Sequence, residues 1–358
     1  MKKRFLKTQM VMLTMICLIL SACGGNTSQS GSVANKKNQS TAAGSSNPIT
    51  FKVGSQDTAE SAAAQLLNSF KANVEEKTNG EITVDIYYSS TLGSLNDMIE
   101  GVSMGTIDMV TAGISSFQGY CDNMVVFDSY LLDGPDDFIA VWNSEVGQAV
   151  VQELRDDAGI YVIGYNLSGV GHLDFWAKKD YSSLAELKNA NLRTNGAKTV
   201  GIACEAFGAV AVHVPSSEQY NAMQTGLIDA MCLDASNMLD QGYLEEGMYR
   251  LQLPDNFLGS SLAISQATWE KLTEEQQAIV KECADSYSAD SAVMYEEKIA
   301  DANAKLQEFK IVNCSISAED IDTANKLVES ALYEYYSEIC NKDYLDQVIA
   351  ILEQRSTK

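Results

Sequence analysis

The feature that most restricts the fold of this sequence is a structural unit that occurs twice along the chain. In each copy a helical segment ends at a glycine, and an Ile-Asp pair leads into a strand-like segment. The glycine segments read GTID over 105–108 and GLID over 226–229. Strands joined through a helix pair in parallel, so the sequence predicts an α/β fold with one unit in each of two similar lobes. The alternative is coincidence, because any α/β protein can end a helix with glycine.

The remaining apolar pattern also alternates between strands and helices. Residues 49–53 and 82–86 alternate apolar and polar side chains, and apolar residues at helical spacing lie between them. A further strand is predicted over 160–165, and helical stretches cover 269–309 and 321–352. The first of these stretches is long enough to bridge both lobes. The globular part exceeds the size of one ordinary core, which also favours two lobes.

The N-terminus has the layout of an export signal. Basic residues precede an apolar run over 10–20, which is too short to cross a membrane. The run ends in Leu-Ser-Ala before Cys23, which resembles a bacterial lipobox. We therefore expect a lipoprotein signal peptide over 1–22, a lipidated Cys23 with a flexible tether over 23–48, and a two-lobe domain over 49–358. The alternative is an ordinary secreted protein with a chance cysteine.

Charge and motif content exclude several classes of function. The formal net charge is −23, which would repel nucleic acid, although one buried cation can still hold an anion locally. The cysteines form no CxxC pair, and disulfides and free thiols both remain open. A nucleophilic set of Cys204, His213 and Asp229 lacks any local activating signature. We expect no catalytic residues, no metal and no cofactor.

Four stretches together resemble a known family. They cover 75–80 before an alternating strand, 92–109, 187–193 continued by 217–229, and 269–277. The chain resembles the extracytoplasmic solute-binding proteins of TRAP transporters, the DctP type. The resemblance implies a two-lobe α/β periplasmic-binding-protein clamp with a hinge and a long bridging helix.

The resemblance also implies a function. A monomeric receptor, anchored by lipid to the extracytoplasmic face of the cell membrane, would capture a small organic anion, such as a carboxylate. It would deliver this ligand to TRAP permease subunits that an ion gradient drives. An ABC-type substrate-binding lipoprotein and a ligand-sensing receptor remain as alternatives.

Arg193 matches the arginine with which this family grips the ligand carboxylate. A guanidinium offers paired donors to a carboxylate and stays charged at any relevant pH. Where the family often has a second arginine, this chain has His172, which can donate to an anion or bind backbone. The family's usual Glu-Asn-Pro is replaced by Cys-Leu-Asp, which brings Asp234 into the candidate set.

Position alone suggests the remaining ligand contacts. Gln56 and Asp57 lie in the first strand–helix loop, and Asn195 closely follows the arginine. Ser216 stands at a helix start, where free backbone N–H groups favour anions. Each of these residues can instead be a turn or cap residue.

Overall fold

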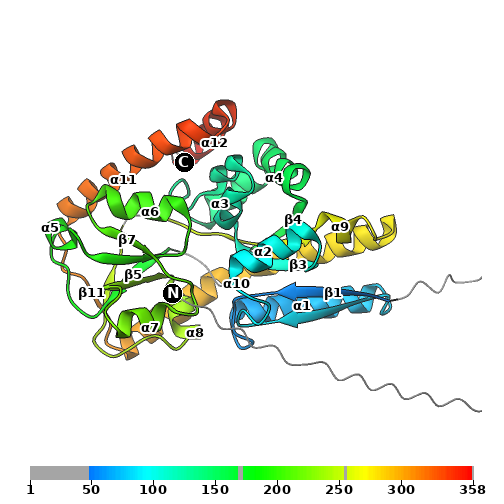
Figure 1. The fold of residues 1–358 in the computed structure, drawn as a ribbon, viewed down its shortest axis with the longest axis horizontal. Helices are drawn as coiled ribbons and strands as arrows, with labels where there is room; N and C mark the ends of the chain where they lie inside the picture. The colour runs from blue at the N-terminus through cyan, green and yellow to red at the C-terminus, as the bar shows by residue number, and fades with distance from the viewer. Residues whose placement is uncertain (1–47, 168–171, 254–255, 357–358) are drawn as a thin grey trace, which may run out of the picture. The chain divides into compact units, whose positions relative to one another are not determined.

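The computed structural model describes residues 48–356 except 168–171 and 254–255 (Figure 1). These residues belong to one compact unit that spans 46–358. The predicted signal peptide, the lipidated Cys23 and all of the predicted tether before Pro48 lie outside the described residues. Among the helices of the described part, none is long and apolar enough to cross a membrane.

The first lobe is built on a five-stranded sheet. In spatial order its strands are β2 (Ile82–Tyr87), β1 (Ile49–Gly54), β3 (Met109–Gly113), β10 (Ser260–Ser265) and β4 (Ile160–Asn166). Strand β1 runs parallel to β2 and β3, whereas β10 is antiparallel to both of its neighbours. The helices of this part of the chain are α1 (Ala62–Lys77), α2 (Leu95–Met104), α4 (Glu145–Ala158) and α9 (Gln266–Trp269). The strands expected near 49, 82 and 160 are confirmed.

The second lobe is built on a six-stranded sheet. In spatial order its strands are β11 (Val312–Asn313), β9 (Tyr249–Leu251), β5 (Asp174–Ala177), β8 (Ala230–Leu233), β6 (Asn191–Thr194) and β7 (Val210–His213). Strand β6 is parallel to β7 and β8, as β1 is to β2 and β3 in the first lobe. The helices are α5 (Leu184–Leu187), α6 (Lys198–Ala206), α7 (Gln219–Gln224) and α8 (Ala235–Asp240).

The repeated glycine segment has the same structure in both lobes. Each glycine ends its helical segment in the left-handed region, with φ of 72° at Gly105 and 77° at Gly226. The Asp108 amide donates to the carbonyl of Lys52 at 3.0 Å, and the Lys52 amide donates back to Asp108 Oδ2 at 2.8 Å. Asp229 exchanges the same two bonds with Asn191, at 2.7 and 2.8 Å. Asp108 therefore holds the start of β3 beside β1, and Asp229 holds the start of β8 beside β6. This correspondence confirms the predicted repeat.

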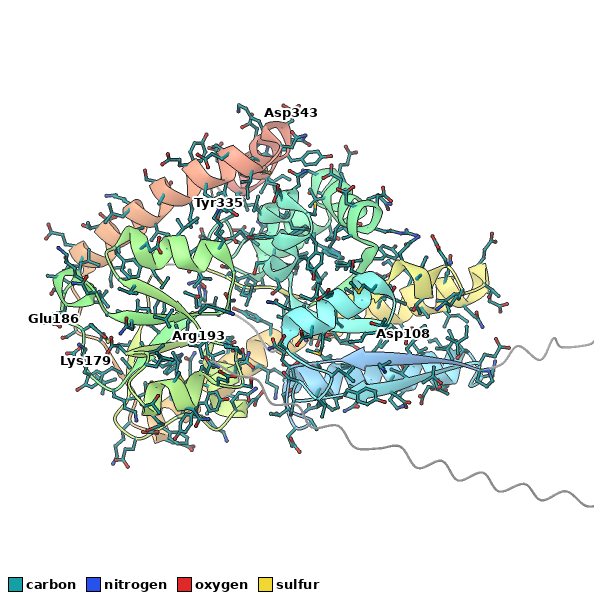
Figure 2. All side chains as sticks on the ribbon, in the orientation of Figure 1. Asp108, Lys179, Glu186, Arg193, Tyr335 and Asp343 are labelled. Carbon is teal, nitrogen blue, oxygen red and sulfur yellow. The ribbon has the colours of Figure 1, made fainter. Side chains whose placement is uncertain are left out.

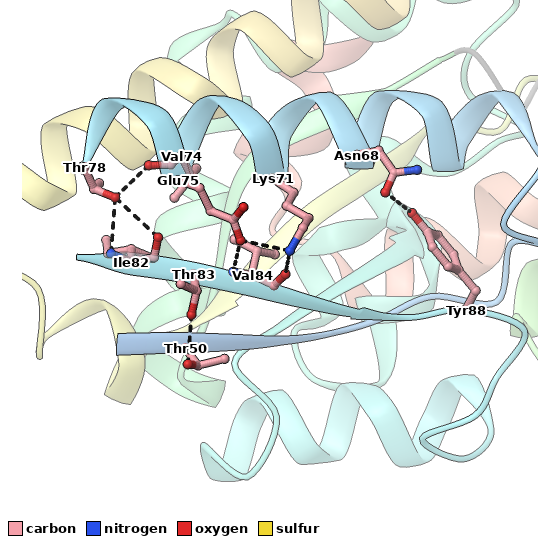
Figure 3. A network of polar contacts seen from close by, with 10 residues as sticks. All are labelled: Thr50, Asn68, Lys71, Val74, Glu75, Thr78, Ile82, Thr83, Val84 and Tyr88. Carbon is pink, nitrogen blue, oxygen red and sulfur yellow. Dashed lines mark hydrogen bonds and ion pairs between the residues drawn. The ribbon is translucent and has the colours of Figure 1, made fainter. Parts of the chain in front are cut away.

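Polar side chains also fix α1 on β2 (Figure 3). Glu75 Oε1 accepts from Lys71 Nζ at 2.8 Å and from the Val84 amide at 2.9 Å, and these bonds lower the pKa of its carboxyl. Thr78 Oγ1 donates to the Val74 carbonyl and accepts from the Ile82 amide. Two residues of the stretch 75–80 therefore close the turn between helix and strand.

Helix α10 (Glu274–Glu308) bridges the two lobes, as the sequence predicts. It packs against α1 and β4 of the first lobe and against α8 of the second. Thr273 and Gln276 form a capping box at its start. The helix is shorter than the predicted 269–309 because Trp269 belongs to α9 and a short break precedes this cap.

The C-terminal helices form a second connection between the lobes. Helix α11 (Ala318–Ile339) packs on α6, whereas α12 (Lys342–Ser356) packs on α3 (Pro135–Trp142) and on the 3₁₀ segment η2 (Asp122–Phe127), which follows η1 (Ile114–Gly119) (Figure 1). The sequence predicted one helical region over 321–352, but the chain is extended at Cys340. The Asn341 amide donates to Asn123 Oδ1 at 2.7 Å, and Asn341 Oδ1 accepts from the Asp343 amide. These bonds begin a new helix.

A buried carboxylate lies where these elements meet. Asp128 is fully buried and directly follows η2. Its Oδ2 accepts from Gln118 Nε2 at 2.6 Å and from Thr199 Oγ1 at 2.7 Å. Its Oδ1 accepts from the hydroxyl of Tyr336 at 2.8 Å and from the amide of Tyr130 at 3.1 Å. Asp128 therefore joins η2, α6 and α11 at one point.

Candidate functional site

A cleft of about 430 Å³ is lined by residues of both lobes. Most of its lining residues stand at or just after the carboxyl ends of β1, β2, β3, β6, β7 and β8, where ligands bind in open α/β sheets. Polar side chains dominate this lining. They include Gln56, Asp57, Ser89, Ser90, Thr111 and Ser260 from the first lobe, and Arg193, Asn195, His213, Ser216, Asp234 and Tyr243 from the second.

Arg193, labelled in Figure 2, extends from β6 and is only 2% exposed. Its Nε donates to the Val214 carbonyl at 2.9 Å, and Nη1 donates to the Cys232 carbonyl at 2.9 Å. Its Nη2 donates to Ser216 Oγ at 3.1 Å. The side chain thus ties β6 to the ends of β7 and β8. Burial lowers its pKa to about 10, so the guanidinium stays charged at neutral pH.

The guanidinium retains two N–H groups for a ligand. A guanidinium has five N–H donors in one plane, and the three bonds above use one on each nitrogen. Because Arg193 also lines the cleft, one N–H on each terminal nitrogen is left for a ligand. Two such donors match the two oxygens of a carboxylate. The bonds to the two backbone carbonyls fix the orientation of the guanidinium before any ligand binds.

Ser216 and Asn195 support the same wall of the cleft. Ser216 accepts from Arg193, and its carbonyl accepts from the Tyr243 hydroxyl at 3.5 Å. Asn195 Oδ1 accepts from the Ala197 amide at 3.0 Å, which is the turn role weighed as the alternative to ligand contact. Both residues line the cleft, so a structural role and a ligand contact are compatible for each.

Asp57 lies on the opposite lobe with Gln56 beside it in the cleft lining. The Ser55 hydroxyl donates to Asp57 Oδ2 at 2.8 Å, and Ser55 in turn accepts from the Thr111 hydroxyl at 2.8 Å. Burial raises the pKa of the Asp57 carboxyl, and the bond from Ser55 partly opposes this rise. This wall of the cleft therefore presents an acceptor held by a chain of hydroxyls.

Asp234 combines a helix cap with a place in the cleft. Its Oδ1 accepts from the Asn237 amide at 2.9 Å and its Oδ2 from the Asn237 side-chain amide at 2.6 Å, which caps α8. Burial raises the pKa of this carboxyl to about 6. The segment 232–234, in which the chain departs from the family pattern, therefore places a second acid in the cleft that Arg193 lines.

The structure does not bring His172 into the lining of this cleft. The side chain is exposed, and its ring meets the ring of Phe257 edge to face with centroids 6.1 Å apart. Its contact with a ligand stays a prediction. Conversely, sequence reasoning missed His213 as a cleft residue, because its alternating strand pattern gave no sign that it ends β7 at the cleft.

A second hollow of about 600 Å³ lies at the junction of α11 and α12. Its charged lining residues are Asp122, Glu153 and Asp157, and no basic side chain lines it among the residues that the structure describes. This hollow therefore suits an organic anion far less than the cleft at Arg193 does.

Comparison with known proteins identifies similar sequences. The family model for bacterial extracellular solute-binding proteins, family 7 (DctP), matches residues 53–339. The 2,3-diketo-L-gulonate-binding periplasmic protein YiaO of Escherichia coli is 27% identical over 68% of this chain and 72% of its own. The C4-dicarboxylate-binding periplasmic protein DctP of Shewanella loihica is 21% identical over 80% of this chain and 84% of its own.

Solved structures share the fold. A TRAP periplasmic solute-binding protein from Desulfovibrio salexigens, with bound orotic acid, has a TM-score of 0.77 at 21% identity and covers 86% of this chain and 99% of its own. One from Haemophilus influenzae, with bound L-gulonate, has a TM-score of 0.77 at 20% identity and covers 85% and 99%. The predicted two-lobe clamp is thereby confirmed.

Proposed function

The chain belongs to the DctP family of bacterial extracellular solute-binding proteins, and we propose that its cleft captures a small organic anion through a carboxylate held by Arg193. Membership confirms the resemblance inferred from the sequence. Proteins of this family bind a solute and deliver it to a TRAP permease, and they are not enzymes. Our proposals concern the solute, its contacts in the cleft and the attachment of this receptor to the membrane.

The observation that carries this proposal is the pair of unused donors on a buried guanidinium. Arg193 is held in place by the Val214 and Cys232 carbonyls while one N–H on each terminal nitrogen remains available. Lobe closure would remove water from this pair and strengthen its bond to a carboxylate. The acids named for the four relatives above support the same solute chemistry.

Contacts around the arginine complete the proposed site. Gln56, Asn195 and Ser216 line the cleft with donors and acceptors that can orient the rest of the solute. We place Asp57 and Asp234 in the same set as acceptors. His172 stands outside the described lining of the cleft, and its proposed contact with the solute is the least supported of the set.

We further propose that lipid on Cys23 anchors the mature receptor to the extracytoplasmic face of the cell membrane, as a monomer on a tether over 23–48. The lipobox-like sequence that ends at Cys23, after the signal over 1–22, supports this anchor. Tethering would raise the effective concentration of the loaded receptor at its permease. Cys23→Ala should release the protein from the membrane fraction, and retention of this variant in that fraction would argue against lipidation.

Calorimetry with matched acids and amides tests the proposed solute chemistry. The full chain, purified in detergent, is titrated with succinate, orotate, L-gulonate and the neutral amide of each. At least one acid should bind at least about thirtyfold more tightly than its amide, because the amide loses a charged pair worth about 2 kcal/mol or more. Equal binding of acid and amide in every binding pair would contradict the proposal.

A further inference from the structure

The charges that line the cleft do not match a simple anion. Arg193 is the one lysine or arginine in the described lining, whereas Asp57 and Asp234 supply two acids. Neither acid forms an ion pair with a described side chain. A ligand that brought only a carboxylate would neutralise the arginine and leave both acids uncompensated as the cleft closes. Burying unpaired carboxylates is costly, so this arrangement would oppose closure.

Asp57 is the better placed of these acids to meet a ligand. It is half-buried, whereas Asp234 is almost fully buried and is occupied by the cap of α8. The one side-chain bond to its carboxylate comes from Ser55 and reaches Oδ2. No side chain among the described residues forms a hydrogen bond with its Oδ1, although the backbone amide of Asp57 also helps to stabilise the carboxylate. The acid also stands on the first lobe, across the cleft from Arg193 on the second.

Within the described part of the chain, the groups whose pKa values respond to Asp57 supply no compensating cation. Burial is the main cause that raises the pKa values of Tyr88, Tyr287 and Asp240, and the nearby charge of Asp57 adds to each rise. Two are phenols and the third is another acid. Burial raises the pKa of Asp240 and Lys298 on α10 partly opposes this rise, but Lys298 is not part of the cleft lining. The surroundings of Asp57 are thus acidic, which favours a positively charged nitrogen in the cleft.

We propose that the solute is a zwitterion whose carboxylate binds Arg193 and whose ammonium group binds Asp57. This inference rests on the proposed function and adds a second charge to the solute. Such a ligand compensates charge on both walls at once. Because the two walls belong to different lobes, its two ends would draw the lobes together, and binding would favour the closed form.

Ligand sets with a shared carbon skeleton test this inference. The full chain is titrated by calorimetry with L-alanine, L-lactate and propionate, then with 4-aminobutyrate, 4-hydroxybutyrate and butyrate, then with L-glutamate, L-2-hydroxyglutarate and glutarate. L-gulonate is added as a polyhydroxylated acid. In at least one set, the amino member should bind about tenfold or more tightly than its hydroxyl and unsubstituted partners, as a charge-assisted bond implies.

Variants then assign the preference to one side chain. Asp57→Asn should weaken the amino member about tenfold or more and change the hydroxyl member by less than about threefold. Asp57→Ser serves as a second variant if the first folds poorly. Asp240→Asn is the matched control, because it removes the same charge from a nearby acid outside the cleft lining, and it should retain the preference for the amino member.

The outcomes separate the two proposals. If hydroxyl or polyhydroxylated acids bind more tightly than every amino acid, or if Asp57→Asn weakens all ligands equally, the zwitterion inference is overturned and the carboxylate function stands. If an amino member binds but its neutral amide binds equally well, the proposed role of the carboxylate is rejected together with the zwitterion inference. If no carboxylate in the panel binds, with or without an amine, both proposals are rejected.

Discussion

Replacing Asp128 should weaken the protein strongly. The side chain is fully buried and accepts four hydrogen bonds at 2.6 to 3.1 Å. Asp128→Ala would leave all four donors without this acceptor. Two of those donors, Thr199 and Tyr336, come from α6 and α11, so the change would loosen the point at which the C-terminal helices meet both lobes.

The expected magnitude follows from these contacts. A hydrogen bond to a charged group contributes about 1.5 to 3 kcal/mol, but burial of the carboxylate, which raises its pKa, offsets part of the total. Removing one partner of a buried charged network typically costs about 3 to 5 kcal/mol. We therefore expect Asp128→Ala to lower the free energy of unfolding by about 3 kcal/mol or more. Tyr336→Phe and Thr199→Val each remove one donor to this carboxylate, so each should cost about 1.5 kcal/mol.

Chemical denaturation followed by circular dichroism measures these differences, and thermal melts provide a check. At about 1.5 °C per kcal/mol for a folded unit of this size, Asp128→Ala should lower the Tm by about 4.5 °C or more. The two single-donor variants should fall between Asp128→Ala and the unmodified protein. An Asp128→Ala variant within about 1 kcal/mol of the unmodified protein would refute the view that this carboxylate joins the lobes.

Two further predictions concern the acids that precede β3 and β8 and the acid that caps α8. Asp108 is partly buried and accepts from the Lys52 amide and the Thr268 hydroxyl, so Asp108→Asn should cost about 1 to 2 kcal/mol in chemical denaturation. Asp229 is exposed and accepts one strand amide, so Asp229→Asn should cost less, about 0.5 to 1 kcal/mol, and a larger effect of Asp229→Asn than of Asp108→Asn would contradict this order. For Asp234, burial raises the folded-state pKa to about 6, so between about pH 4 and 6 the folded protein keeps a proton that the unfolded chain releases. Its contribution to stability therefore falls as the pH rises through this window. Asp234→Asn, which retains a good cap residue, should flatten this decrease, and an unchanged slope across melts at pH 4, 5, 6 and 7 would contradict the assignment.

Local patterns made much of the fold predictable. Apolar alternation located β1, β2 and β4, and the Gly-X-Ile-Asp segments located equivalent turns in both lobes. The break between α11 and α12 was missed because it depends on Asn123, which lies far away in the sequence and holds the Asn341 amide. Helical periodicity carries no signal for such a long-range bond.

The candidate site was predictable only in part. Gln56, Asp57, Asn195 and Ser216 were chosen from their places near strand ends and helix starts, and all line the cleft with Arg193. Their ligand contacts remain predictions. The contacts of Arg193 with two backbone carbonyls were not foreseeable, because backbone groups have no identity in a sequence and the pairing of β6 with β7 and β8 brings them together.

The most direct test of the central claim is a crystal structure of the receptor with the carboxylate that binds most tightly in calorimetry. The measured quantities are the distances from Arg193 Nη1 and Nη2 to the two carboxylate oxygens of the ligand. The account predicts one bond of about 2.7 to 2.9 Å from each nitrogen, with the bonds to the Val214 and Cys232 carbonyls retained. A ligand carboxylate bound elsewhere, with both nitrogens engaged only by the protein, would contradict it.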